Sequence, residues 1–180
     1  MSTAKEIVNA IEKAFREKSF DSHDSAVRVG RSGHYVFEWK SNEVSVKGEL
    51  LQEDSIGVMM NSLIVEKDIG EDKEISAYLK GVADAIEKRV TYLMEPLKVI
   101  EIDSTSNAVQ IRSEKPEMRE GFLSYFELIL KSGKWFGHRD HVSLCRHSHR
   151  PEAEKRRRKV AFPLTKVQLE RLLSDLIEIL

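Results

Sequence analysis

The spacing of apolar residues alternates along the chain between a helical period and a period of two, and this limits the fold class. Helical spacing covers three segments, which begin near Thr3, after Gly70 and at Thr165. Between them, alternating apolar and polar residues predict strands, and turn signals join these strands as antiparallel hairpins. We therefore expect an α+β fold in which an N-terminal, a long central and a C-terminal helix pack on an antiparallel sheet.

The expected elements can be given approximate bounds. Capping-box patterns at Thr3 with Glu6 and at Thr165 with Gln168 indicate where the first and last helices begin. Two strand segments, 55–66 and 121–131, are apolar on both faces, which predicts that they run through the middle of the sheet. Strands are expected near residues 26–30, 34–40, 43–51, 55–66, 97–102, 107–113, 121–131, 140–149 and 155–162.

Short sequence echoes suggest an internal repeat. NAIEKAF at 9–15 matches DAIEKRV at 84–90, and SAVRVGRS at 25–32 matches NAVQIRS at 107–113. Chance similarity is the alternative, because matches this short discriminate poorly. We expect residues 1–180 to form a single domain, and if the echoes mark a repeat it consists of two packed pseudo-repeats, about 1–70 and 71–180.

Composition places the chain among ordinary globular proteins. It has 180 residues, of which 41% are hydrophobic and 33% charged, and its formal net charge is −1. The N-terminus lacks the apolar core of a signal peptide and no apolar run is long enough to span a bilayer, so we expect a cytoplasmic protein without membrane contact. The single cysteine fits a reducing compartment. No catalytic signature or cofactor fingerprint is present, so no cofactor is expected.

Charge and histidine gather in one segment, residues 138–159, which we call the basic segment. It holds four of the six histidines, the only cysteine and eight Lys or Arg residues against three acidic ones. A turn-like break at 151–154 predicts that this segment is a β-hairpin near the sheet edge. If opposite residue numbers sum to 305, Arg146 faces Lys159 and His147 faces Arg158, and such like-charge pairs destabilise a sheet.

Three interpretations of the basic segment compete. It can be a solvated hairpin whose charges keep a sheet edge from aggregating, or a ribbon that binds phosphate groups. A metal site is disfavoured, because His141 and His149 lie about 26 Å apart on one strand at about 3.3 Å per residue. The candidate contacts to an anion or a partner are Arg146, Arg150, Lys155, Arg156, Arg157, Arg158 and Lys159.

The preferred functional hypothesis is a non-catalytic protein-interaction or small regulatory module of unknown partner. The alternatives are nucleic-acid or polyanion binding through 146–159, for which support is weaker, and an enzyme whose site the sequence does not display. The protein is expected to be a monomer or a homodimer. The C-terminal helix, 165–180, is apolar over a wide face, which suits either the core or a dimer interface.

The expected order of elements broadly resembles that of small secretion-chaperone-like proteins, which hold partners in extended form across their surfaces. It also resembles duplicated saddle-shaped folds of the TATA-binding type. Both likenesses concern element order and involve no shared motif, and a fold by itself does not fix a function. They imply an architecture of helices packed on antiparallel sheet.

Overall fold

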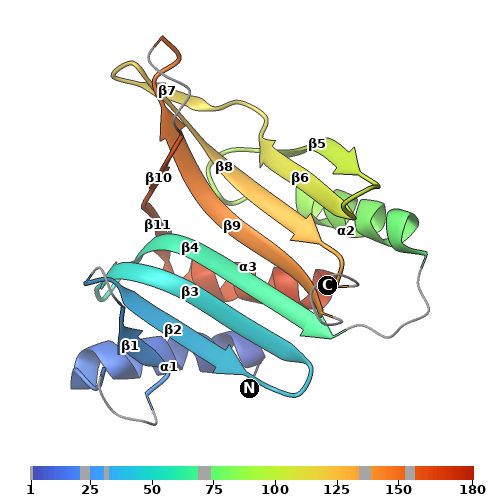
Figure 1. Ribbon diagram of the computed structural model, residues 1–180. Helices are drawn as coiled ribbons and strands as arrows, with labels where there is room; N and C mark the ends of the chain where they lie inside the picture. The colour runs from blue at the N-terminus through green and yellow to red at the C-terminus, as the bar shows by residue number, and fades with distance from the viewer. Residues whose placement is uncertain (1, 21–24, 31–32, 69–73, 134–138, 153–156) are drawn as a thin grey trace.

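The fold was obtained as a computed structural model, which describes residues 2–20, 25–30, 33–68, 74–133, 139–152 and 157–180. It confirms the α+β class, with three helices and a large antiparallel sheet (Figure 1). The helices are α1 (Thr3–Glu17), α2 (Ile75–Arg89) and α3 (Lys166–Ile179). The strands are β1 (Val27–Val29), β2 (Tyr35–Lys40), β3 (Val44–Glu53), β4 (Gly57–Asp68), β5 (Leu97–Asp103), β6 (Ala108–Ser113), β7 (Glu117–Arg119), β8 (Phe122–Lys131), β9 (Arg139–His149), β10 (Arg158–Val160) and β11 (Phe162–Thr165).

The helix starts agree with the sequence in one case and differ in another. At α3, the Thr165 hydroxyl accepts from the Gln168 backbone N–H and the Gln168 side chain accepts from the Thr165 N–H, which completes the predicted capping box. At α1, Ser2 is the N-cap in place of Thr3, and its hydroxyl accepts from the Lys5 N–H. The helix therefore begins one residue earlier than the Thr3 pattern predicts.

The strands form one continuous antiparallel sheet in the order β1-β2-β3-β4-β9-β8-β6-β5. The segments predicted to be inner strands are β4 and β8, and both have neighbours on each side. Strand β9 pairs with β4 only through residues 139–145, and beyond that point its partner is β10. Strand β11 pairs with the other end of β4. Residues 158–165 thus fill the space where β4 and β9 diverge (Figure 1).

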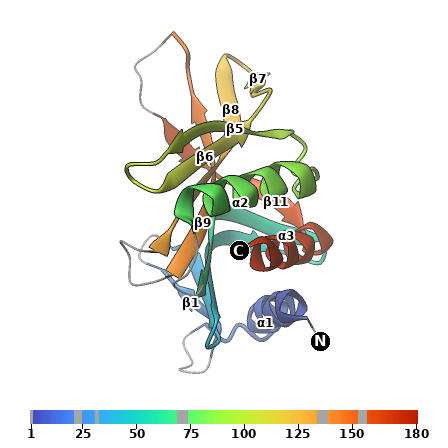
Figure 2. The same ribbon diagram turned by 90° about the vertical axis from the view of Figure 1, so that its right-hand side faces the viewer.

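All three helices lie on the same face of the sheet (Figure 2). Helix α3 packs against α1, α2 and β4, and its leucines Leu169, Leu172 and Leu173 are fully buried. Its apolar stripe is therefore used in the core, and Ile179 also packs against that core. Within the described residues, no helix combines the length and apolarity needed to cross a membrane.

The two halves of the sheet have a common order when strands are counted outward from its centre. From β4 the order is β3, β2, β1, and from β9 it is β8, β6, β5. The sequence echoes do not fall on equivalent places in this order. Residues 25–32 include β1, fourth from the centre, whereas 107–113 include β6, which is third. The strand order would match β1 with β5, whereas the sequence echo matches β1 with β6, so the two criteria align the halves differently.

Candidate functional site

Among the described residues, no helix lies on the face of the sheet opposite α1, α2 and α3, and Figure 1 looks onto this face. Side chains alternate between the two faces of a strand, and the buried Leu63, Leu128 and Leu144 belong to the helix-covered core. Their strand neighbours therefore point to the opposite side, which we call the helix-free face. Its central side chains are Ser62, Ile64, Tyr125, Glu127, Ile129, Ser143, Cys145 and His147.

Three hydrogen-bond donors converge on one carboxylate of this face, and a histidine ring lies beside it. Gln110 Nε2 and Arg112 Nε donate to Glu127 Oε2 at 2.6 and 2.8 Å. Arg157 Nη1 lies 3.2 Å from the same oxygen, and His147 Nε2 lies 3.2 Å from Oε1. These residues, with Glu127, form what we call the Glu127 cluster. The Glu127 side chain is only 10% exposed, so its negative charge is stabilised by these donors instead of by water.

Cross-strand pairing explains the convergence. Arg112 of β6 lies opposite Glu127 of β8, and Glu127 lies opposite Cys145 of β9. His147 is two residues further along β9 and therefore points to the same face as Cys145. No short sequence motif encodes the cluster, because four separate segments supply it.

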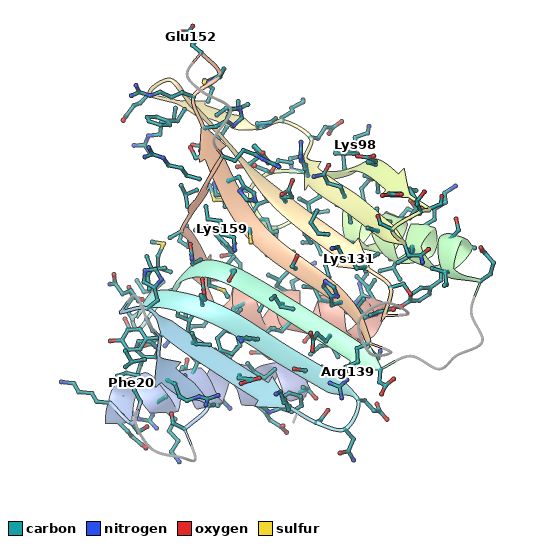
Figure 3. All side chains as sticks on the ribbon, in the orientation of Figure 1. Phe20, Lys98, Lys131, Arg139, Glu152 and Lys159 are labelled. Atoms are coloured by element: carbon teal, nitrogen blue, oxygen red, sulfur yellow. The ribbon has the colours of Figure 1, made fainter. Side chains whose placement is uncertain are left out.

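Tyr125 and Lys159 border the cluster. The Arg112 guanidinium lies over the Tyr125 ring, 5.2 Å from its centroid, and the Tyr125 hydroxyl lies 3.4 Å from Arg157 Nη1. Lys159 of β10 is paired with His147 of β9 and lies close enough to the Cys145 thiol to affect its pKa. Figure 3 shows Lys159 between the two halves of the sheet.

Burial decides the protonation of two groups on this face. It raises the pKa of Cys145, against the opposing effect of Lys159, so the thiol stays protonated at neutral pH. Burial also lowers the pKa of His147, and the nearby cations Arg157, Lys159 and Arg112 act in the same direction, while Glu127 opposes them. His147 is therefore a neutral imidazole at neutral pH.

The structure divides the predicted contact residues between different surroundings. Arg146 Nη2 lies 2.7 Å from a carboxylate oxygen of both Glu95 and Glu117, and its guanidinium lies 4.8 Å from the Phe126 ring centroid. Arg150 stacks over Phe122 at 4.5 Å. The side chains of Arg157 and Lys159 lie near Glu127 and Cys145 on the helix-free face. Lys155 and Arg156 lie outside the described residues.

The predicted hairpin exists, but its register differs by one residue. Arg158 lies opposite Ser148, Lys159 opposite His147 and Val160 opposite Arg146, so paired numbers sum to 306 in place of 305. This register removes the predicted pairing of Arg146 with Lys159, which would have placed two cations opposite each other. The same register points Lys159 to the helix-free face. Its neighbour Arg158, which pairs with the buried Ser148, points to the other face.

The position of the hairpin in the sheet also differs from the prediction. Strand β9 is not near the edge but pairs with β4 on one side and β8 on the other. Glu152, which follows the end of β9, projects away from the body of the sheet (Figure 3). The histidines of β9 are therefore largely sheltered by neighbouring strands. The described residues contain no group of three or more His, Cys, Asp or Glu placed to hold a metal ion.

Sequence reasoning did not identify Gln110, Arg112, Tyr125 or Glu127. One signal was available: Glu127 is a single acidic residue inside the apolar run from Phe122 to Leu130. A charge at an inner-strand position is rarely buried unless it is paired. Comparisons of the chain with protein-family models, with curated proteins and with solved structures found no match.

Proposed function

We propose that this chain is a non-catalytic protein-interaction or small regulatory module that binds its partner on the helix-free face. The observation that carries the proposal is the placement of all three helices on one face of a continuous sheet, since no helix or strand of the described residues covers the other face (Figure 2). The centre of that face mixes Ile64 and Ile129 with polar neighbours, a composition suited to a protein interface.

The protonation and pairing of the cluster argue for binding over catalysis. The Glu127 carboxylate is already held by hydrogen bonds from Gln110, Arg112 and Arg157 within the fold. The Cys145 thiol is protonated, whereas a nucleophilic cysteine requires the thiolate. The thiol is therefore not prepared for nucleophilic chemistry.

A shallow pocket of about 190 Å³ lies beside the cluster and can receive a partner side chain. Gln110 and Ile129 form one part of its lining, and the acidic Glu101 and Asp103 of β5 form another. It shares Gln110 with the Glu127 cluster, so the pocket and the cluster are parts of one surface. Side chains on strands are held more rigidly than side chains on loops, which favours specific recognition.

The proposal is tested by photo-crosslinking in cells. A photoreactive phenylalanine analogue replaces Ser143, at the centre of the helix-free face, or Lys80, which is exposed on α2. We expect one defined protein adduct from position 143 and none from position 80, and Ile64→Arg should abolish the adduct. Adducts of equal yield from both positions, or none from position 143, contradict the proposal.

Polyanion binding through 146–159 remains the second candidate, because Arg157 and Lys159 share a region with Arg112. It predicts retention on heparin, a steep salt dependence, and loss of DNA and RNA binding when Arg156, Arg157 and Arg158 are all replaced by Ala. Binding by this triple variant equal to that of the parent would eliminate the candidate. A protein partner whose binding is insensitive to salt favours the first proposal.

Two further expectations remain proposals. The common strand order of the two halves supports a pseudo-twofold repeat of about 1–70 and 71–180. The single cysteine, Cys145, supports a reducing and hence cytoplasmic environment, since it has no second cysteine in the chain with which to pair.

A further inference from the structure

We infer that the helix-free face recognises an acidic segment of the protein partner, whose carboxylates bind at Arg112, Arg157 and Lys159. This inference rests on the proposed function and specifies the chemistry of the partner. The three cations act on His147, and the carboxylates near this histidine and the adjacent Cys145 are Glu127 and Glu49, so the cations outnumber the carboxylates in this region. We call Arg112, Arg157 and Lys159 the cation triad.

The excess charge is accessible. The Arg157 side chain is 47% exposed and Lys159 is also exposed, although Glu127 beneath them is buried. Among the described residues, no carboxylate lies within 4 Å of the Lys159 ammonium. A partner carboxylate therefore meets one cation without an ion pair, Lys159, and two cations that share the single carboxylate of Glu127.

The triad also has unused hydrogen-bond donors. A guanidinium carries five N–H groups and an ammonium three. Arg112 uses its Nε on Glu127, and Arg157 contacts Glu127 and Tyr125 through Nη1, at 3.2 and 3.4 Å. A bidentate carboxylate suits the remaining donors of a guanidinium.

Several cations elsewhere in the fold are neutralised, which makes the triad distinctive. Arg146 contacts the carboxylates of Glu95 and Glu117, and Arg89 contacts those of Asp175 and Glu178. Each of these arginines contacts two carboxylates, whereas Arg112 and Arg157 share a single one. Of these arginines, the two on the helix-free face therefore have fewer carboxylate partners.

The surroundings favour a protein segment over a nucleic acid. Tyr125 is only 5% exposed and Arg112 lies over its ring, so this aromatic ring is not free for base stacking. The apolar Ile64 and Ile129 lie on the same face and suit the aliphatic side chains of a peptide.

The spacing of the strands sets the spacing of the recognised acids. Arg112 on β6 and Lys159 on β10 are three strand positions apart, across β8 and β9, which corresponds to about 14 Å at about 4.8 Å per strand. An extended segment rises about 3.3 Å per residue, so acidic residues about four positions apart span the triad.

The test measures fluorescence anisotropy of fluorescein-labelled octaglutamate and of an eight-nucleotide oligothymidylate with the full chain at low salt. The double variant Arg157→Ala/Lys159→Ala removes two exposed charges from the triad. Its matched control, Lys5→Ala/Lys80→Ala, removes two exposed charges from α1 and α2. Circular dichroism checks that both variants fold.

We expect the parent to bind octaglutamate, the triad variant to bind it at least tenfold more weakly, and the control to stay within twofold of the parent. No binding by the parent, or equal losses in both variants, overturns the inference. Tighter triad-dependent binding of the oligonucleotide overturns it in favour of a nucleic acid. If the parent does not bind octaglutamate but crosslinking from position 143 gives the adduct, the inference of an acidic partner segment is wrong and the proposed protein-interaction function stands.

Discussion

Arg146 shows how a residue that looks like a partner contact in the sequence becomes part of the core. The sequence places it in the basic segment, yet its guanidinium contacts Glu95, Glu117 and the Phe126 ring. The Glu95 side chain is only 9% exposed, so its carboxylate depends on this arginine for a counter-charge. Arg146 therefore joins the segment before β5, strand β7 and strand β9.

Arg146→Ala should lower the free energy of unfolding by about 3 kcal/mol, because it leaves the Glu95 carboxylate buried without a partner. Urea denaturation measures the change. Adding Glu95→Gln to this variant should recover part of the loss, since the buried charge is then gone. Arg119→Ala is the control, because its side chain is 79% exposed and should cost less than about 0.5 kcal/mol. Absence of any recovery in the double variant would show that Glu95 is not the cause.

The buried histidines should make the protein less stable in mild acid. Burial lowers the pKa of His147 and of His141 in the folded state, whereas in the unfolded chain each titrates near its ordinary value of about 6.5. Below about pH 6.5 the unfolded state therefore binds more protons than the folded state. The contribution of the two neutral histidines to the free energy of unfolding is complete above that pH. It is lost as the pH falls toward their pKa values in the folded state.

Urea midpoints at pH 7.5, 6.5 and 5.5 measure this effect. We expect the midpoint of the parent to fall with acidification and that of His141→Gln/His147→Gln to fall less. A double variant with the same pH dependence as the parent would assign the acid sensitivity to other groups.

Two glycines in regular elements should respond to the same substitution in opposite directions. A methyl group on Gly48 of β3 would overlap the ring of Phe37, which is fully buried on the neighbouring strand β2. Gly81 of α2 has no atom within 4 Å of such a methyl group. One glycine makes room for a core side chain, while the other only lowers helix propensity.

Gly48→Ala should therefore destabilise the fold by about 2 kcal/mol through overpacking. Gly81→Ala should stabilise it by about 0.8 kcal/mol through helix propensity. Urea denaturation of the two variants measures both changes. A Gly48→Ala variant as stable as the parent would mean that Phe37 does not occupy the place described.

The elements were predictable because their signals are local. The alternation of Tyr35, Phe37 and Trp39 gave β2 within one residue, and the Thr165 capping box fixed the start of α3. The prediction of a single strand at 155–162 was less accurate, since the structure has two short strands, at 158–160 and 162–165. This division follows from pairing with both β9 and β4, which the segment's own sequence does not reveal.

At the scale of the whole molecule, the candidate site depends on register, which is not a local property. A shift of one residue moves a strand's side chains to the other face. The observed register places Lys159 on the helix-free face opposite His147 and leaves Arg146 opposite Val160. The Glu127 cluster likewise requires β6, β8 and β9 to be aligned, so sequence reasoning located the basic segment but not its acceptor.

The arrangement of α3 predicts that residues 1–70 and 71–180 do not fold separately. Helix α3 belongs to the second half of the chain, yet it packs on α1 and β4 of the first half. Strands β9 and β11, also from the second half, pair with β4. A fragment of residues 1–70 would thus expose the apolar side chains of α1 and β4 that these elements cover.

We expect fragments 1–70 and 71–180 each to lack a cooperative urea transition and a dispersed amide NMR spectrum, and to regain both when they are co-expressed. The full chain is the control and should unfold in one transition. A sharp transition of fragment 1–70 alone would contradict this, because it would mean that the burial supplied by α3 is dispensable. The expected result would instead make the single sheet, from β1 to β5, the smallest unit that carries the helix-free face.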